Sequence, residues 1–262
     1  MSGRANETVL ITGASSGIGL ELARCFAAEG CHLVLLARNT EALAALAGEL
    51  RQAHQTDVLV ITADLALPET PARVLQELQS RGVAVDVLVN NAGFGACDTF
   101  AGLPLQRQLE MIQVNVTSLT ALTGLFLPGM IGRRRGGVLN VGSVAGFLPG
   151  PGMAIYFATK AFVLSFTEAL AEELAGTGVT ATVLCPGPTE SNFGQVARGP
   201  RARRVQTGKM TAKAVAACGH RAFRDSKLVA ISGWRNRLIV FLIWLLPRGF
   251  VRKMAFFFNR TQ

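Results

Sequence analysis

A tyrosine and a lysine that could exchange a proton lie four positions apart in a stretch of helical period, residues 154–174. Tyr156 is the only tyrosine among 262 residues, and Lys160 is the first lysine of the chain. On a helix, side chains at i and i+4 share one face, about 5–6 Å apart at Cβ. A neighbouring ammonium stabilises a phenolate and lowers a phenol pKa that is near 10 in water. The pair predicts a phenol tuned for proton transfer; the alternative is a packed aromatic beside a lysine that reaches solvent.

A glycine-rich turn near the N-terminus could bind phosphate. Residues 12–19 read TGASSGIG, with glycines at Gly13, Gly17 and Gly19, directly after a β-rich run. Glycine adopts positive φ and lets backbone amides approach a diphosphate at the start of the next helix. About 20 residues on, where an NAD site usually has an acid, the chain has Arg38, which suits a phosphate. We therefore expect NADP(H) in preference to NAD(H); the alternative is that Arg38 stacks on adenine or faces solvent.

The elements that must position these residues alternate along the chain. Seven β-rich runs, several of them continuously apolar, are typical of strands covered on both faces. They are 9–12, 32–37, 58–62, 85–90, 137–141, 179–184 and 228–231. Helical stretches between them include 18–29, 41–52, 71–79 and 154–174. The alternation predicts an α/β, doubly wound Rossmann fold: a parallel sheet with helices on both faces and a ligand crevice beyond the carboxyl ends of the strands.

Composition favours one domain over residues 1–262. Half of the residues are apolar, enough to bury a core of this size. The five cysteines are scattered without metal-ligand spacing, so we expect no metal site, no disulfide framework and a reducing compartment. No secretory signal is visible after Met1, and we expect a cytoplasmic protein.

Several motifs, in chain order over residues 8 to 190, resemble the single-domain branch of the short-chain dehydrogenase/reductase family. They are Thr-Gly-x-x-x-Gly-x-Gly at 12–19, Asn-Asn-Ala-Gly at 90–93, Asn115, Ser143, Tyr-x-x-x-Lys at 156–160 and Pro186-Gly187. The resemblance implies a seven-stranded sheet in the order 3-2-1-4-5-6-7. It also implies an enzyme that interconverts a carbonyl and a secondary alcohol, with hydride from a nicotinamide.

The catalytic residues that the resemblance implies are Asn115, Ser143, Tyr156 and Lys160. Tyr156 would exchange a proton with the substrate oxygen, which Ser143 would orient. Lys160 would lower the Tyr156 pKa and hold the nicotinamide ribose, and Asn115 would fix a water that links Lys160 to solvent. Singly, Asn115 and Ser143 also fit a helix-internal amide and a turn hydroxyl. The complete set favours catalysis over a non-catalytic NADP-binding sensor.

The resemblance also implies cofactor contacts along the carboxyl edge of the sheet. Asp64 would meet the adenine, residues 91–93 the adenosine ribose, and Pro186, Gly187 and Thr189 the nicotinamide and diphosphate. The full expected set is Gly13, Ser15, Ser16, Gly17, Ile18, Gly19, Arg38, Asp64, Leu65, Asn91, Ala92, Gly93, Tyr156, Lys160, Pro186, Gly187 and Thr189.

The surroundings of the four catalytic residues are apolar. Phe94, residues 145–149 and Met153 favour an apolar small-molecule ketone or aldehyde, although Phe147 and Leu148 equally suit core or subunit packing. The resemblance also implies a substrate flap over about 189–226. Its basic residues are Arg198, Arg201, Arg203, Arg204, Lys209 and Lys213. A solvated basic face is the simplest interpretation; a β-ketoacyl thioester as substrate, or attraction to anionic lipid, is the alternative.

The basic residues are concentrated late in the chain. Of 26 Lys and Arg and 17 Asp and Glu, 15 basic residues and one acid, Asp225, lie in residues 198–262. The tail 233–262 mixes these cations with aromatic and aliphatic residues. Its most apolar part, 238–246, is about 14 Å long as a helix, too short for a bilayer core of about 30 Å. We expect the tail to pack on a second subunit of a homodimer or homotetramer or on the pocket, and second to that, to contact a membrane peripherally; nucleic acid is not expected.

Overall fold

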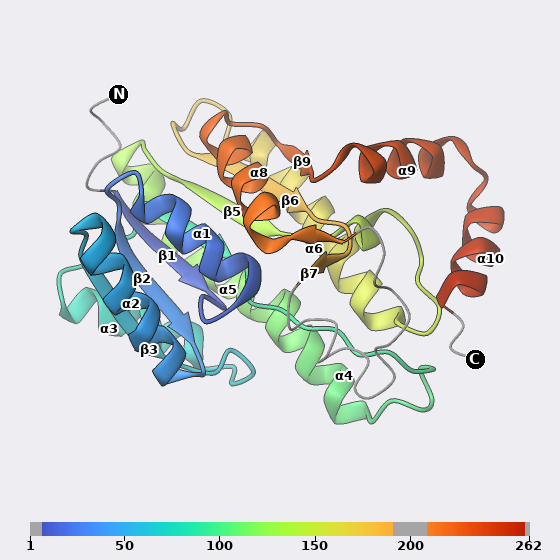
Figure 1. Cartoon of the computed structure of the whole chain (residues 1–262), viewed down its shortest axis with the longest axis horizontal. Coiled ribbons are helices and arrows are strands. Elements are labelled where there is room, and N and C mark those ends of the chain that lie inside the picture. Colours follow the sequence, from blue (N-terminus) through green and yellow to red (C-terminus); the bar gives the residue numbers. More distant parts are fainter. Residues whose placement is uncertain (1–6, 191–208, 260–262) are drawn as a thin grey trace.

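The centre of the molecule is a seven-stranded parallel sheet (Figure 1). The structure is a computed structural model of the chain, and it describes residues 7–190 and 209–259. The sheet order is β3-β2-β1-β4-β5-β6-β9. The strands are β1 (Thr8–Thr12), β2 (His32–Ala37), β3 (Val58–Thr62), β4 (Val87–Asn90), β5 (Gly137–Val141), β6 (Thr180–Cys185) and β9 (Val229–Ile231). Because β9 is the seventh strand of this sheet along the chain, the predicted order 3-2-1-4-5-6-7 is confirmed.

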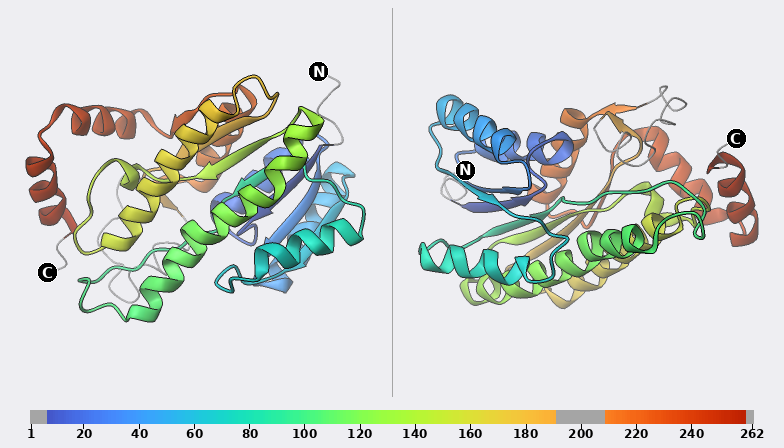
Figure 2. Two further views of the ribbon diagram at one scale, coloured as in Figure 1. Left: turned by 180° about the vertical axis from the view of Figure 1, so that it is seen from behind. Right: turned by 90° about the horizontal axis from the view of Figure 1, so that it is seen from below.

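Helices cover both faces of the sheet, as the alternation of elements predicts (Figure 2). One face carries α1 (Gly17–Ala27), α2 (Thr40–His54) and α8 (Ala212–Arg224). The other carries α3 (Thr70–Ser80), α5 (Ser118–Arg133) and α6 (Ala154–Glu173). A helix α4 (Leu105–Ile112) continues into α5 through the π-helical turn η1 (Gln113–Thr117).

Successive residues of one strand serve the two halves of the core. In β1, Val9 and Ile11 pack with the α1, α2 and α8 side, whereas Leu10 packs with the α3, α5 and α6 side. All three side chains have no exposed surface. This two-sided burial explains why the strand runs are continuously apolar rather than alternating.

Five shorter or later elements complete the described part of the fold. They are the 3₁₀ turn η2 (Val144–Phe147), the two-residue strands β7 (Thr189–Glu190) and β8 (Met210–Thr211), and the C-terminal helices α9 (Trp234–Leu245) and α10 (Arg248–Asn259). The views agree that α9 and α10 lead away from the end of β9 and from the sheet (Figures 1 and 2).

Helix α8 is a core element, which differs from the expected extent of the substrate flap. Val215 and Ala216 are fully buried, and the rings of Phe26 and Phe223 meet edge to face, 6.2 Å apart. Arg224 binds Glu29 across the α1–α8 contact at 2.7 Å. Residues 212–224 therefore cannot serve as a flap. Of the basic residues predicted there, Arg198, Arg201, Arg203 and Arg204 lie outside the described residues.

Within residues 7–190 and 209–259, two helical stretches are long and apolar enough, by length and composition, to cross a membrane. They are Leu105–Arg133 and Ala154–Glu173. Helices that line the core of a globular domain meet the same criteria, and both stretches carry residues packed in the core clusters, Phe126 and Leu170 among them. Their apolar character is accounted for by the packing of α5 and α6 against the sheet.

Candidate active site

A cleft of about 760 Å³ runs along the carboxyl ends of the strands. Seventeen of the nineteen predicted catalytic and cofactor-binding residues line it. These are Gly13, Ser15, Ser16, Gly17, Ile18, Arg38, Asp64, Leu65, Asn91, Ala92, Gly93, Ser143, Tyr156, Lys160, Pro186, Gly187 and Thr189, of which Ser143 is the purely catalytic one. The exceptions, Gly19 and Asn115, are buried and do not line the cleft.

The glycine turn has the backbone that its sequence predicts. Gly13 and Gly17 have φ of +65° and +57°, a region that favours glycine. A Cβ on Gly13 would lie 2.9 Å from the Cα of Ala92, and one on Gly19 would lie 2.4 Å from the carbonyl oxygen of Gly13. Two of the three glycines thus shape the turn, and Gly19 allows α1 to approach it closely.

Tyr156 and Ser143 lie together at one end of the cleft. Both are largely buried, and their hydroxyls are hydrogen-bonded to each other. The Ser143 hydroxyl also accepts from the Ala145 amide at 3.1 Å, where it caps η2. These bonds fix the Ser143 side chain, so the phenol of Tyr156 faces a pre-oriented partner.

Lys160 is held one turn along α6 from Tyr156. Its Nζ donates to the carbonyl of Val141 at 2.7 Å and lies 5.9 Å from the centroid of the Tyr156 ring. The side chain is only 6% exposed. The spacing of four positions therefore does place the two side chains on one face, with the ammonium directed at the end of β5.

Asn115 joins the loop after β4 to the catalytic helix. Its side-chain amide donates to the carbonyl of Phe94 at 2.9 Å and to Thr159 at 3.1 Å, and its oxygen accepts from the Phe94 amide at 3.0 Å. Thr159 in turn donates to the carbonyl of Tyr156 at 2.7 Å. The residue sits in η1, and single π-turns within helices are frequent at functional sites. Asn115 thus positions α6 from behind the cleft; its expected water relay stays a prediction.

Comparison with known proteins agrees with this geometry. The family profile described as short chain dehydrogenase matches residues 7–201 of the chain. The chain belongs to the short-chain dehydrogenase/reductase family. A ketoacyl reductase, HetN of Nostoc sp., is 32% identical over 218 residues, which cover 82% of this chain and 76% of the relative. As a member of this family, the protein is an oxidoreductase that acts on CH–OH groups.

Solved structures of similar dehydrogenases hold a nicotinamide dinucleotide. A short-chain dehydrogenase from Sphingobium yanoikuyae in complex with NADPH superposes with a TM-score of 0.81 at 36% identity, covering 86% of this chain and 87% of that one. A family member from Burkholderia phymatum in complex with NAD superposes with a TM-score of 0.82 at 28% identity, covering 92% and 94%. Similar members of the family thus bind NADPH or NAD, which supports a nucleotide cofactor for this chain.

The residues present fit such a dinucleotide. The Cβ-free turn at Gly13 and Gly17 leads into the N-terminus of α1, where Ser16 leaves the first helical amides without a side-chain cap. Arg38, with 76% of its side chain exposed, lies 3.8 Å from Asp64. The neighbouring Asn39 is occupied in capping α2, since its oxygen accepts from the Ala42 amide at 2.9 Å. Arg38 is therefore the side chain after β2 that is available to a ligand.

The tyrosine pKa in this dehydrogenase/reductase differs from the expected direction. Burial raises the pKa of Tyr156 to about 12, and the hydrogen bond from Ser143 offsets part of that rise. Burial also lowers the pKa of Lys160 to about 8. The i, i+4 spacing predicts that the ammonium dominates, but both groups are enclosed by protein, so desolvation outweighs their mutual interaction. The phenol is thus held in its protonated form.

Two hydrogen-bonding residues of the site stand in the quoted motifs, at 12–19 and 90–93, but were not predicted as site residues. Thr12 accepts from the amides of Asn91 and Ala92 at 3.0 and 2.9 Å, and Asn91 donates back to the Thr12 carbonyl at 2.8 Å. Asn90 donates to Asn140 at 2.9 Å, its partner in the β4–β5 register. The sequence feature that could have revealed both residues is a polar side chain at the end of a strand that is otherwise apolar. Thr12 joins the glycine turn to the loop after β4, and Asn90 joins the two central strands.

The end of the cleft beyond Tyr156 is formed by apolar and charged side chains. Phe94 and Met153, both predicted there, line it, and Ala145 does so from η2. Arg107 and Glu110 of α4 also line it, and the Arg107 guanidinium stacks 4.0 Å from the Phe94 ring centroid. No sequence motif indicates that Arg107 and Glu110 line the cleft. Phe147 instead packs with the core cluster of α6 and β6, which is the core alternative weighed for it.

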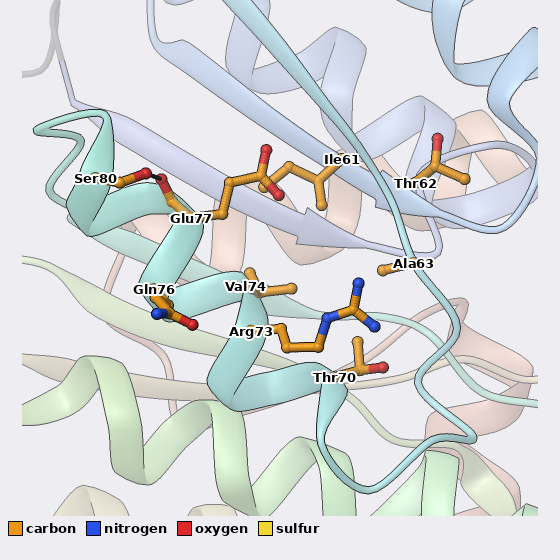
Figure 3. Close-up of a pocket in the computed structure, with 9 residues that line it drawn as sticks. All are labelled: Ile61, Thr62, Ala63, Thr70, Arg73, Val74, Gln76, Glu77 and Ser80. Atoms are coloured by element: carbon orange, nitrogen blue, oxygen red, sulfur yellow. Dashed lines mark hydrogen bonds between the residues drawn. The ribbon is translucent and has the colours of Figure 1, made fainter.

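A smaller hollow of about 420 Å³ adjoins the cleft between β3 and α3 (Figure 3). Ala63 lines both, and Arg73 extends toward it. The hollow contains none of the predicted site residues. It provides a cation close to the cofactor cleft but outside it.

Proposed function

We propose that this dehydrogenase/reductase is an NADP(H)-dependent enzyme that interconverts an apolar carbonyl compound and its secondary alcohol, with Tyr156 as the proton donor. The observation that carries the proposal is the placement of Tyr156. Its phenol is buried, is hydrogen-bonded to Ser143 and comes from α6, which packs on β5 and β6, whereas Arg38 follows β2 on the other side of the sheet's centre. A dinucleotide bound with its adenosine near Arg38 has its nicotinamide near Tyr156.

The chain's own residues supply orientation and the proton. The nicotinamide, when bound, supplies or accepts the hydride. Ser143 holds the substrate oxygen against the phenol, and Tyr156 donates its proton to that oxygen as the carbonyl is reduced. The raised pKa of Tyr156, about 12, keeps that proton in place at neutral pH. Lys160, whose Nζ lines the cleft beside Gly93, holds the nicotinamide ribose.

The preference for NADP(H) rests on Arg38. A guanidinium can bind a phosphate through two parallel hydrogen bonds, and a ribose without the phosphate offers no such contact. No acidic side chain follows β2 directly, since residues 37–40 are Ala, Arg, Asn and Thr. The loose 3.8 Å contact with Asp64 leaves the guanidinium exposed to a ligand.

The proposal is tested by the oxidation of NADPH in the presence of a panel of ketones, aldehydes, quinones, steroids and acyl thioesters. We expect turnover with at least one apolar carbonyl compound, its loss in Tyr156→Phe, and unchanged NADPH binding in that variant. NADPH binding without turnover across the whole panel would instead support a non-catalytic NADP-binding sensor.

A β-ketoacyl thioester is the second candidate substrate. The ketoacyl reductase of Nostoc sp. is a relative by sequence, and Lys209 lines the cleft near Thr189, where it can meet a phosphate of a thioester carrier. A kcat/KM for a 3-oxoacyl thioester well above that for the matching free ketone supports this candidate. We further expect the protein to be cytoplasmic. We also expect it to be a homodimer or homotetramer, and sedimentation of the purified protein tests this oligomeric state.

A further inference from the structure

The helix α9 exposes one continuous row of large apolar side chains. Trp234, Leu238, Phe241 and Leu245 are 70%, 49%, 56% and 58% exposed. Their spacing of four, three and four residues puts them on a single face of a helix. Ile243, the only buried residue of α9, is 9% exposed and belongs to the face toward the protein. The helix therefore packs on the domain by one narrow side and directs its apolar row outward.

The next helix continues this exposed apolar surface. Phe250 and Phe256 of α10 are 56% and 51% exposed, while Val251 and Ala255 are buried. Trp244, at the end of α9, is 82% exposed. We call α9 and α10 together, residues 234–259, the C-terminal arm. Large apolar patches of this kind on a folded protein mark an interaction surface.

Positive charge borders the apolar row. On a helical projection Arg235 and Arg237 fall on opposite sides of it, and the cations of α10 are Arg248, Arg252 and Lys253. All five side chains are exposed. No Asp or Glu occurs in the sequence after Asp225. The arm is therefore apolar and purely cationic.

We propose that the C-terminal arm binds the surface of an anionic lipid bilayer, with α9 lying in the plane of the headgroups. An outward apolar row enters the boundary between headgroups and acyl chains, and flanking arginines reach lipid phosphates. Tryptophan prefers this depth, and anionic lipid attracts each juxtaposed cation. Each helix has 12 residues, about 18 Å at 1.5 Å per residue, so the arm lies on the membrane and does not cross it.

The alternative occupants fit the arm less well. Two copies paired through this surface would bring the same five cations together without an acid to neutralise them. Packing over the substrate pocket leaves the outward row unexplained, since the helix meets the pocket region by Asn236, which lies against Gly187. An anionic bilayer matches both the apolar row and the charge.

The two tryptophans of the chain are both in α9, so intrinsic tryptophan fluorescence reports on the arm alone. The full-length protein is titrated with vesicles of phosphatidylcholine alone, and of phosphatidylcholine with phosphatidylserine. We expect a blue shift of the emission and co-sedimentation with the anionic vesicles, weakened by high salt and by neutral lipid. Phe241→Ser with Leu245→Ser should lower the affinity for anionic vesicles about 10- to 100-fold, because two apolar side chains that enter the membrane boundary are lost.

A matched control lies on another surface. Phe100→Ser with Leu105→Ser removes two side chains that are 62% and 65% exposed, outside the arm, and should leave vesicle binding unchanged. Absence of any shift or sedimentation with anionic vesicles at low salt overturns the proposal, as does an equal loss in both double variants. An emission already shifted to the blue without lipid, together with a dimer mass that Phe241→Ser and Leu245→Ser abolish, overturns it in favour of a subunit contact.

Discussion

The cofactor cleft and the C-terminal arm differ in which side chains they bury and which they expose. In the cleft, polar side chains are buried and held by protein partners: Asn115, 1% exposed, makes three hydrogen bonds, and Lys160 is fixed by the Val141 carbonyl. In the arm, apolar side chains are exposed and the cations have no acidic neighbours in sequence. The side chains of the cleft are thus held in place by partners in the same chain, whereas the exposed side chains of the arm are proposed to find their partner in an anionic bilayer.

The comparison predicts that substitutions in the cleft change kcat, cofactor affinity or the free energy of unfolding. Substitutions in the arm should change none of these. The largest effect is expected for Tyr156→Phe, which removes one hydroxyl and keeps the ring. Loss of a positioned general acid should lower kcat by about 10²- to 10⁴-fold. NADPH affinity and thermal stability should be unchanged. A loss of less than tenfold, with cofactor binding intact, would remove Tyr156 from the chemistry.

Gly19→Ala tests how tightly the glycine turn is packed. The added Cβ would lie 2.4 Å from both the Gly13 carbonyl oxygen and the Asn91 side chain. We expect the free energy of unfolding to fall by about 2–3 kcal/mol and NADPH affinity to fall with it. Gly48→Ala is the matched control, because it lies on an exposed part of α2 with no atom within 4 Å of the new Cβ. It should stabilise the protein by about 0.5–1 kcal/mol in urea unfolding; equal effects at both positions would contradict the close approach.

Arg38→Ala examines the phosphate end of the cleft. Loss of a charge-assisted hydrogen bond should weaken NADPH binding about 10- to 30-fold and leave NADH binding nearly unchanged. The dissociation constants of both cofactors can be measured by fluorescence titration. Arg73→Ala removes a guanidinium in the adjoining hollow and controls for long-range charge (Figure 3). Equal affinity of the native protein for both cofactors would refute the preference.

Lys160→Met tests the energetic cost of burying the ammonium. The pKa of Lys160 is lowered from 10.5 to about 8 by burial, so between those pH values the unfolded chain carries a proton that the folded chain lacks. Stability therefore rises with pH over that window, and the burial cost is fully present below pH 8. At pH 7 Lys160→Met should raise the free energy of unfolding by about 1–2 kcal/mol and abolish the rise. Lys213→Met, at an exposed position, should leave the pH profile unchanged.

The smallest effect is expected in the arm. Phe241→Ser and Leu245→Ser alter exposed side chains, so each should change the free energy of unfolding by less than about 0.5 kcal/mol. Urea unfolding in lipid-free buffer measures this. A cost above 2 kcal/mol would show that the arm belongs to the folded core, and the contrast between the two regions would fail.

The strands of the fold and the glycine turn of the cleft could be predicted because each depends on residues that are close together in the sequence. A continuously apolar run such as 32–37 requires burial on both faces, and a glycine such as Gly13 at a strand end requires the positive φ that the structure has. All seven strand runs and their order follow from such local requirements and the family resemblance. The seven strands begin and end within two residues of the predicted runs.

The features that could not be predicted depend on distance in three dimensions. Thr12 bonds to Asn91 across 79 residues, and no spacing reveals that pair. The direction of the Tyr156 pKa shift depends on how completely the site is enclosed, which an i, i+4 interval does not report. The extent of the flap was wrong for the same reason, because α8 is amphipathic and its burial against α1 appears only in the packing.

The most direct test of the central assignment is a crystal structure of the enzyme with NADP⁺ and an alcohol product. The account predicts the Tyr156 hydroxyl within about 2.6–3.2 Å of the alcohol oxygen, with Ser143 on the same atom and the nicotinamide beside both. A phenol directed away from the nicotinamide, or shielded from the alcohol by protein, would contradict it.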